Sequence, residues 1–346
     1  MSPYAMSMLL SSLSTGTLIT LISNHWFLAW IGLELNTLAI IPLMSKMHHP
    51  RATEAAIKYF LIQSMASALL LFATTLNAWY TGEWTIINMQ TTLPTLMLTT
   101  ALMMKLAVAP FHLWLPDVIQ GLDLTACMIL LTWQKLAPMA LLFQAGPNMN
   151  PMLMVLLGTL SLLVGGWGGL NQPQIRKIMA YSSIAHLGWM IIVMSYLPNL
   201  ALLNLLVYLL MNMAMFMMII NLSSTNINKM ASSWMKNPPL TSAMMIILMS
   251  LGGLPPLTGF LPKWLILEEI VKQNMTPIAT MAAISALLSL FFYLRLSYTT
   301  SLTNPPTPQN SKIMWRLKTN PNQIMPMTII ISTMILPISP SIMNLT

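Results

Sequence analysis

The stretch LGGLPPLTGFLPKWLILEEI, residues 251–270, decides the fold. It lies in a largely apolar chain, yet its three prolines and three glycines break what would otherwise be a continuous hydrophobic helix. Lys263 follows directly after the last of these prolines. A break and a cation are both unfavourable in lipid, so a membrane-spanning segment that carries the two together needs a structural or functional reason.

The composition of the whole chain is that of an integral membrane protein. Of its 346 residues, 56% are hydrophobic and 6% are charged, whereas a soluble domain carries about 25% charged residues. The net charge of +8 comes from few, scattered cations and does not indicate a nucleic-acid-binding protein. The single cysteine, Cys127, excludes a disulfide framework within the chain. The 35 methionines suggest a shifted codon assignment, such as that of animal mitochondria.

Apolar runs of about 18 residues or more predict eleven membrane-spanning helices and no soluble domain. The predicted spans cover residues 3–23, 25–45, 55–77, 92–115, 124–144, 151–171, 175–197, 199–222, 240–271, 275–298 and 324–345. The first of them lacks the basic region of a cleavable signal. We therefore expect an all-α, polytopic membrane protein with a single transmembrane domain.

The loop cations predict the orientation of the chain. If the N-terminus faces side X, the loops on that side carry Lys46, Arg51, Arg176, Lys177, Lys229, Lys236, Lys312, Arg316 and Lys318. The loops on the opposite side, Y, carry little more than Lys272. The positive-inside rule makes X the cytoplasm-like side, which is the matrix in a mitochondrion. An odd number of spans then places the C-terminus on side Y.

An earlier stretch repeats the proline pattern of the opening one. APFHLWLPD at 109–117 and PPLTGFLPK at 255–263 each contain two prolines six residues apart. An apolar or aromatic pair precedes the second proline in both. The offset of 146 residues corresponds to five predicted spans, which is an odd number, so the second copy crosses the membrane in the opposite direction.

This offset predicts two inverted five-helix repeats with matching broken helices. The first repeat covers about 3–144, the second about 151–298, and an additional helix covers about 324–345. The breaks are expected near 105–120 and 252–270. Freed backbone groups at membrane depth persist only where protein or a hydrated cavity surrounds them. Paired broken helices in inverted halves mark the transport path of many transporters.

Five ionisable residues lie near the middle of five different predicted spans. They are Glu34, Lys105, Lys135, His186 and Lys263. A lone charge at the bilayer centre costs roughly 2.5–3.5 kcal/mol on insertion scales. The groups could simply join helices by ion pairs and hydrogen bonds. One carboxylate cannot neutralise three lysines, however, so some lysines must be hydrated or uncharged, as a proton relay requires.

Two histidines, one at mid-span and one at the first break, each allow two interpretations. His186 either takes part in the relay or only hydrogen-bonds a neighbouring helix, and its ordinary titration range suits proton passage. His112 lies between the two prolines of the first break and has the same two interpretations.

The acidic residues near the breaks also allow two interpretations, a role in proton access or exit and a purely structural role. Glu268 and Glu269 follow Lys263 by about one and a half helical turns and could line an exit near side Y. Asp117 and Asp123 could line an access path after the first break, or they are solvated loop ends. No haem-type histidine pair, cysteine cluster or dinucleotide fingerprint indicates redox chemistry.

Six stretches together carry a more specific signal. They are GLELN, ATEAAIKYF, KLAVAPFHLWLPDV, LLTWQKLAP, RKIMAYSSIAHLGWM and LGGLPPLTGFLPKW. They resemble the chain 2 family of mitochondrial NADH–ubiquinone oxidoreductase, whose members are antiporter-like core subunits of respiratory complex I. The resemblance covers essentially the whole chain.

The resemblance implies a proton-translocating subunit of the membrane arm, located in the mitochondrial inner membrane. It implies that Glu34 pairs with Lys105, that Lys135 is the bridging lysine and that Lys263 is the terminal lysine at the second broken helix. His186 takes the central position, where some sister subunits carry lysine. It also implies that the subunit belongs to the H⁺-translocating NADH:ubiquinone reductase and couples NADH-to-ubiquinone electron transfer to proton pumping.

The resemblance also implies cofactors and partners. The complex uses NADH, FMN, iron–sulfur clusters and ubiquinone, whereas this chain is expected to bind no cofactor or metal and to perform no redox chemistry. The implied partners are the neighbouring antiporter-like chain 4, the small chain 4L, chain 6, accessory subunits and membrane lipids such as cardiolipin, with no nucleic acid.

The chain departs from the family in one respect, and two alternative functions are compatible with the sequence. Bacterial counterparts and sister subunits carry more core spans, and the missing ones would precede the first repeat, where an accessory subunit or lipid would fill their place. A stand-alone cation/proton antiporter of the same fold is the main alternative. A non-pumping structural spacer is the other, although it leaves the paired breaks unexplained.

Overall fold

The computed structural model describes residues 2–46, 49–89, 91–235, 237–303, 324–334 and 336–338. Within these ranges the regular structure is helical, with two isolated β-bridges. The α-helices are α1 (Pro3–Ile22), α2 (Trp26–Met44), α3 (Pro50–Thr81), α4 (Thr92–Leu106), α5 (Trp114–Gly121), α6 (Leu124–Leu131), α7 (Trp133–Ala145), α8 (Pro151–Gly168), α9 (Ile175–Met194), α10 (Pro198–Leu222), α11 (Ile227–Ala231), α12 (Pro238–Gly252), α13 (Phe260–Lys272), α14 (Thr276–Leu302) and α15 (Ile324–Met334). Short 3₁₀ helices occupy Gly146–Asn148, Ser232–Met235 and Leu336–Ile338.

The helices begin and end where the sequence supplies caps. α3 shows both ends clearly: the His49 ring accepts a hydrogen bond from the Arg51 N–H, and Pro50 occupies the first turn. Proline fits there because the first turn has no partner for its missing N–H. At the other end Gly82 takes the left-handed conformation that stops a helix, with φ 74°.

The all-α membrane fold is confirmed for the described part of the chain. Eight helical segments are long and apolar enough to cross a membrane: α1, α2, α3, Leu124–Asn148, α8, α9, α10 and α14. The helices α4, α12 and α15 are apolar but shorter. The count of eleven spans stays a prediction, and most of the predicted span 324–345 beyond Met334 lies outside the described residues.

The predicted span 124–144 is divided rather than continuous. α6 ends at Leu131 and α7 begins at Trp133, with Thr132 between them at φ −111° and ψ −69°. The Thr132 hydroxyl donates a 2.6 Å hydrogen bond to the Met128 carbonyl, which competes with the backbone ladder. The division places Lys135 in the first turn of α7.

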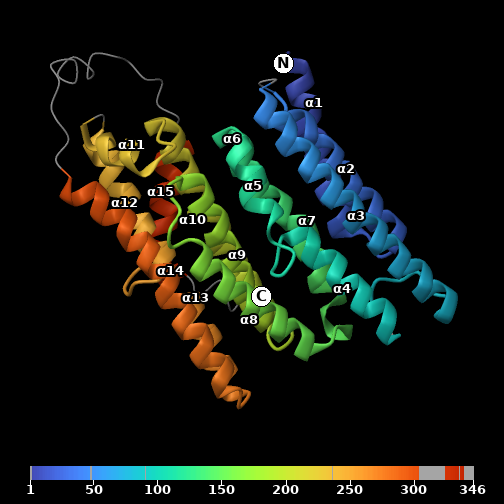
Figure 1. Ribbon diagram of the computed structural model, residues 1–346. Helices are drawn as coiled ribbons and strands as arrows, with labels where there is room; N and C mark the ends of the chain where they lie inside the picture. Colours follow the sequence, from blue (N-terminus) through green and yellow to red (C-terminus); the bar gives the residue numbers. More distant parts are fainter. Residues whose placement is uncertain are drawn as a thin grey trace. The chain divides into compact units, whose positions relative to one another are not determined.

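Two compact units make up the chain, and each is described by itself. The first comprises Met1–Ser161 and Met194–Pro198, and the second comprises Leu162–Val193 and Asn199–Thr346. In the first unit α1 packs on α2, α3 packs on α4 and α5, and α7 contacts α1, α2 and α4 (Figure 1). In the second unit α12 and α13 pack on α14, and α15 packs on α12. The assignment of these units to two inverted repeats stays a prediction.

Both predicted breaks are present. α4 ends at Leu106 and α5 begins at Trp114, while α12 ends at Gly252 and α13 begins at Phe260. α12 begins and ends 146 residues after α4, and α13 begins 146 residues after α5. The sequence offset is thus reproduced by the helix bounds, which shows that the two breaks share one backbone design.

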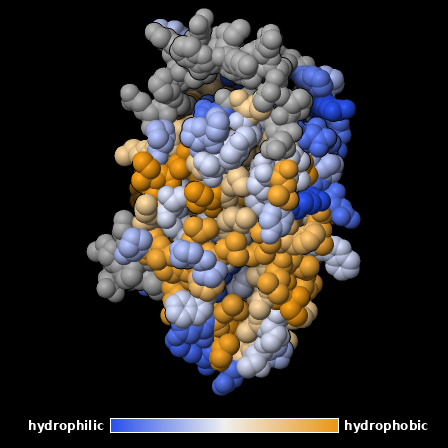
Figure 2. Space-filling model, turned by 90° about the vertical axis from the view of Figure 1, so that its left-hand side faces the viewer, coloured by the Kyte–Doolittle hydropathy of each residue, from blue (hydrophilic) through white to orange (hydrophobic). Residues whose placement is uncertain are grey.

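Large apolar side chains are exposed along many of the helices. Figure 2 shows one face of the molecule, on which hydrophobic side chains dominate the middle and hydrophilic ones gather toward the ends. On α14, for example, Ile284, Leu287 and Phe291 are all more than half exposed. Surfaces of this kind are stable against lipid or another subunit rather than against water.

Candidate functional site

The carbonyl end of α4 holds a lysine amine. α4 stops because Ala107 takes the left-handed conformation, φ 63°, and its N–H bonds back to α4 carbonyls. A helix end leaves its last carbonyls without partners in the helix. Lys135 Nζ, from the first turn of α7, donates a hydrogen bond to the Leu106 carbonyl. The negative end of the helix dipole favours a cation at this place.

The carbonyl end of α12 holds a lysine amine in the same way. Gly253, at φ 83°, stops this helix. Lys263 Nζ donates to the Leu251 carbonyl at 3.1 Å and to the Gly252 carbonyl at 3.0 Å. A Cβ added at Gly253 would lie 2.9 Å from Lys263 Nζ, so glycine leaves room for the amine as well as for the backbone turn.

The two breaks therefore resemble each other in charge as well as in backbone. Leu106 and Gly252, whose carbonyls receive the amines, are 146 residues apart. The linear alignment sets Asp117 against Lys263 and predicts that the breaks differ in charge. The structure corrects this expectation, because the lysine at the first break comes from the following span and not from the break itself.

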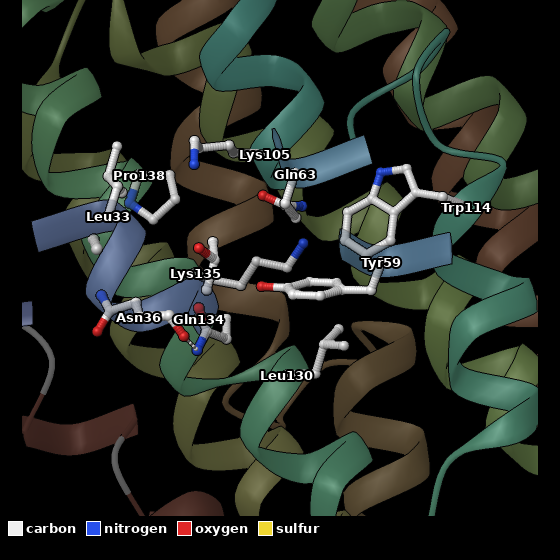
Figure 3. Close-up of a pocket in the computed structure, with 12 residues that line it drawn as sticks. Leu33, Asn36, Tyr59, Gln63, Lys105, Trp114, Leu130, Gln134, Lys135 and Pro138 are labelled. Atoms are coloured by element: carbon white, nitrogen blue, oxygen red, sulfur yellow. Dashed lines mark hydrogen bonds between the residues drawn. The ribbon is translucent and has the colours of Figure 1, made fainter. Parts of the chain in front are cut away.

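A small cavity in the first unit joins two of the predicted lysines (Figure 3). It is lined by Leu33, Asn36, Thr37, Tyr59, Gln63, Lys105, Trp114, Leu130, Gln134, Lys135, Ala137 and Pro138. The space open to the centre of a water-sized sphere is about 20 Å³, which is enough for about one water molecule. Lys105 is 5% exposed, and its Nζ has no hydrogen-bond partner among the described residues. A buried amine of this kind calls for a polar partner such as water.

Glu34 lies beside this cavity but does not line it. Its side chain is half-buried and accepts a 3.1 Å hydrogen bond from the Thr37 hydroxyl. An electrostatic interaction connects it to Lys105. The pairing of Glu34 with Lys105 stays a prediction, because the two side chains form no salt bridge at 4 Å or less among the described residues.

A second cavity, in the second unit, joins His186 and Lys263. Ser182, Ala185, Trp189, Ser289 and Tyr293 complete its lining, and the space for a water centre is about 10 Å³, at the lower limit for one water. Both His186 and Lys263 are 7% exposed. The imidazole lies 5.5 Å from the Tyr208 ring, centroid to centroid, and interacts electrostatically with Lys263.

The remaining predicted residues lie outside these two cavities. His112 sits in the first break with Nδ1 3.2 Å from the Pro110 carbonyl. Glu268 forms a 2.9 Å salt bridge with Lys272, and Glu269 accepts a hydrogen bond from Gln273. An exit role for either glutamate, and a relay role for His112, stay predictions. Within the described ranges no group of three or more His, Cys, Asp or Glu could hold a metal ion.

The sequence analysis missed the polar and aromatic lining of the first cavity. Tyr59 and Gln63 are buried on α3, and the Tyr59 hydroxyl points into the cavity in Figure 3. The available signal was their four-residue spacing, which sets them on one face of an otherwise apolar helix. Trp114 and Tyr293 had no such signal, because an aromatic residue in a membrane helix usually serves packing.

Comparisons with known proteins fit this geometry. Residues 23–289 match the family model described as NADH:quinone oxidoreductase/Mrp antiporter, TM, and residues 290–343 match NADH dehydrogenase subunit 2 C-terminus. NADH-ubiquinone oxidoreductase chain 2 of Tetraodon nigroviridis is 56% identical over 100% of this chain and 99% of the relative. The Xenopus laevis protein of the same name is 53% identical over 98% of this chain and 99% of that protein.

Solved structures share the fold. A chain of respiratory complex I from Thermus thermophilus, determined with bound Aureothin, has a TM-score of 0.84 at 25% identity and matches 97% of this chain. A chain of the Mrp complex from Dietzia sp. has a TM-score of 0.77 at 20% identity over 87% of this chain. The match spans 80% of the Thermus chain and 61% of the Dietzia chain, in keeping with the expected shorter length. By these matches over its whole length, the chain belongs to the NADH-ubiquinone oxidoreductase chain 2 family, within the NADH:quinone oxidoreductase/Mrp antiporter membrane proteins.

Proposed function

We propose that this chain translocates protons as a membrane-arm subunit of respiratory complex I. Glu34, Lys105, Lys135, His186 and Lys263 form the relay, with water molecules between them. Protons are taken up on the matrix side and released on the other side. Changing the charge on Glu34 alters the stability of the proton on Lys105, and this coupling passes a conformational signal into the subunit.

The observation that supports this proposal most strongly is the pair of lysine amines at the carbonyl ends of the two broken helices. Each amine can be charged there, because the helix dipole and the last carbonyls of the helix, which have no partner within it, stabilise the ammonium form. Each also lines a cavity of the size of about one water molecule, through which a proton can leave. A group that is held in place yet can exchange its proton has the properties of a relay station.

The decisive experiment replaces Lys263 in the assembled complex. The complex carrying Lys263→Met is reconstituted into vesicles, and the number of protons moved per NADH oxidised is measured. We expect a ratio below that of the wild type, because the methionine side chain fills the space without carrying a proton. An unchanged ratio in a fully assembled complex would overturn the proposal.

Lys272→Met provides a matched control. Lys272 lies on the same helix, nine residues further on, and forms an exposed salt bridge with Glu268. Surface pairs of this kind contribute little, so the control should keep the wild-type proton ratio. The stand-alone antiporter is tested in the same system, because it predicts cation/proton exchange by the isolated chain.

The proposal extends to location, partners and cofactors. The chain lies in the mitochondrial inner membrane with its N-terminus in the matrix, next to chain 4, chain 4L, chain 6, accessory subunits and lipids such as cardiolipin. The apolar, exposed faces of its helices support such neighbours. NADH, FMN, iron–sulfur clusters and ubiquinone belong to other subunits. Native gel migration with an NADH-oxidising complex, followed by cross-linking, tests these assignments.

A further inference from the structure

Tyr293 lines the second cavity but has no part in the relay described above. It belongs to α14, is 1% exposed and faces the same space as His186 and Lys263. Its hydroxyl oxygen is buried and has no hydrogen-bond partner at ordinary distance among the described residues. A buried hydroxyl normally has such a partner, so this one calls for a polar group that enters the cavity, such as water.

The Tyr293 ring lies against the carbonyl end of α12. A Cβ added at Gly252 would lie 3.7 Å from Tyr293 Cδ2, so the ring packs directly on this glycine. The Gly252 carbonyl accepts the 3.0 Å hydrogen bond from Lys263 Nζ. The tyrosine ring therefore rests on one of the residues that hold the lysine amine.

The Tyr293 hydroxyl is directed toward α9. It interacts at longer range with the side chain of Ser182, which also lines the cavity. Ser182 precedes His186 by four residues, so the two lie on one face of α9. The Ser182 hydroxyl donates a 2.8 Å hydrogen bond to the Met179 carbonyl, which leaves its oxygen able to accept one. Tyr293 thus extends from the end of α12 to the face of α9 that carries the imidazole.

Two glycines hold the helices around this cavity close together. A Cβ added at Gly165, on α8, would lie 2.6 Å from the backbone nitrogen of Ala185, the residue before His186. A Cβ added at Gly169, directly after α8, would lie 2.8 Å from Phe292 Cδ1. Small residues allow membrane helices to approach closely. The Phe292 ring lies 4.4 Å from the Tyr293 ring, centroid to centroid, so the tyrosine has little room to move.

We propose that Tyr293 is a further proton-carrying residue, which passes the proton from His186 to Lys263. This inference rests on the proposed function and adds a residue to its relay. The protonated imidazole gives a proton to a water molecule in the cavity, and this water gives a proton to the tyrosine hydroxyl oxygen. The hydroxyl gives its own proton to the uncharged Lys263 amine. The imidazole ends neutral, the amine ends as ammonium, and the tyrosine and the water are unchanged.

A phenol is suited to this place for two reasons. Its hydroxyl both donates and accepts a hydrogen bond, as each transfer requires. It also carries no charge in its ordinary state, so it can stay buried beside a lysine without the cost of a further ion. A hydroxyl that connects the two groups is useful here because the cavity, with about 10 Å³ for a water centre, has room for no long chain of water molecules.

The experiment removes only the hydroxyl of Tyr293 in the assembled complex. Tyr293→Phe keeps the ring on Gly252 and on Phe292, and the number of protons moved per NADH oxidised is measured in vesicles. We expect the ratio to fall to that of Lys263→Met, since the proton no longer reaches the lysine. Tyr298→Phe is the control, because Tyr298 lies on the same helix but is 54% exposed. It should keep the wild-type ratio.

A second variant separates proton transfer from packing. Histidine fits the place of a tyrosine ring less well than phenylalanine does, but it can accept and donate a proton. Tyr293→His should therefore give a higher ratio than Tyr293→Phe. A packing role predicts the opposite order and would overturn the proposal. If the Tyr293 variants do not assemble, Ser182→Ala replaces them, because it removes the oxygen that the hydroxyl faces. It should lower the ratio, and a wild-type ratio would overturn the proposal.

The outcomes distinguish this inference from the proposed function. If Lys263→Met keeps the wild-type ratio, the proposed function is wrong whatever the Tyr293 variants show. If Lys263→Met lowers the ratio while Tyr293→Phe keeps it, the relay stands and the role of Tyr293 is overturned.

Discussion

Gly253 at the second break and Ala107 at the first break lie next to lysine amines that come from different parts of the chain. Both Gly253 and Ala107 stop a helix in the left-handed conformation. The left-handed conformation costs an L-residue about 1–2 kcal/mol. Alanine is tolerated at 107 because the amine at that break belongs to Lys135 and approaches from another helix. At 253 the amine of Lys263 occupies the space that a Cβ would fill.

Gly253→Ala should therefore impair both stability and function. The backbone strain lowers the free energy of unfolding by about 1–2 kcal/mol, and the new Cβ displaces Lys263 from the carbonyls of α12. Thermal unfolding of the complex and the proton ratio in vesicles measure the two effects. Gly82→Ala is the control, since Gly82 has φ 74° but nothing within 4 Å of an added Cβ. It should lose stability only, and equal loss of pumping in both variants would contradict this explanation.

The C-terminal helix supports the second break. The Thr258 hydroxyl, buried in the segment between α12 and α13, donates a 2.8 Å hydrogen bond to the Ser332 carbonyl near the end of α15. That carbonyl belongs to the last turn of α15 and has no partner in its own helix. α15 thus lies outside the predicted repeats yet fixes the backbone next to Lys263.

Thr258→Val should loosen this support. It leaves the Ser332 carbonyl buried without its donor, which costs about 1–3 kcal/mol. Faster amide hydrogen exchange in residues 253–259 is the expected result. Thr280→Val serves as the reference, because the Thr280 hydroxyl is exposed and only bonds its own helix at Pro277. Unchanged exchange in 253–259 would show that α15 is not a support.

At the scale of the whole molecule, the distribution of the cations predicts the orientation. Five cations assigned to predicted side X lie among the described residues: Lys46, which follows α2, and Arg51, Arg176, Lys177 and Lys229, which lie within helices near the predicted loops. Cations near the ends of spans are retained on the cytoplasm-like side during insertion. The surface between the loops is apolar enough for lipid contact, as Figure 2 shows for one face.

Epitope tags on the two termini test this orientation together with the span count. In sealed vesicles that expose the matrix side, added protease should remove an N-terminal tag and leave a C-terminal tag intact. The reverse should hold in vesicles of opposite orientation. If both tags are cleaved from the same side, the number of spans is even and the count of eleven is wrong.

The sequence by itself determined the membrane class, most of the helices and the two breaks, and it predicted the ionisable residues of the relay. These features follow from local chemistry: apolar runs of spanning length, prolines that remove a backbone donor, and charges too costly to be placed in lipid without a role. The helix bounds then reproduced the 146-residue offset residue by residue. Family membership also followed, because the motifs are specific.

Only the tertiary structure decided which groups meet. A linear comparison pairs Lys263 with Asp117, but Lys135 is the residue that occupies the equivalent place at the first break. The meeting of Tyr59 and Trp114 at the first cavity was also not predicted, since it depends on how α3 packs against α5. The physical reason is that a helix end offers carbonyls to any nearby amine, and proximity between spans is set by packing and not by order along the chain.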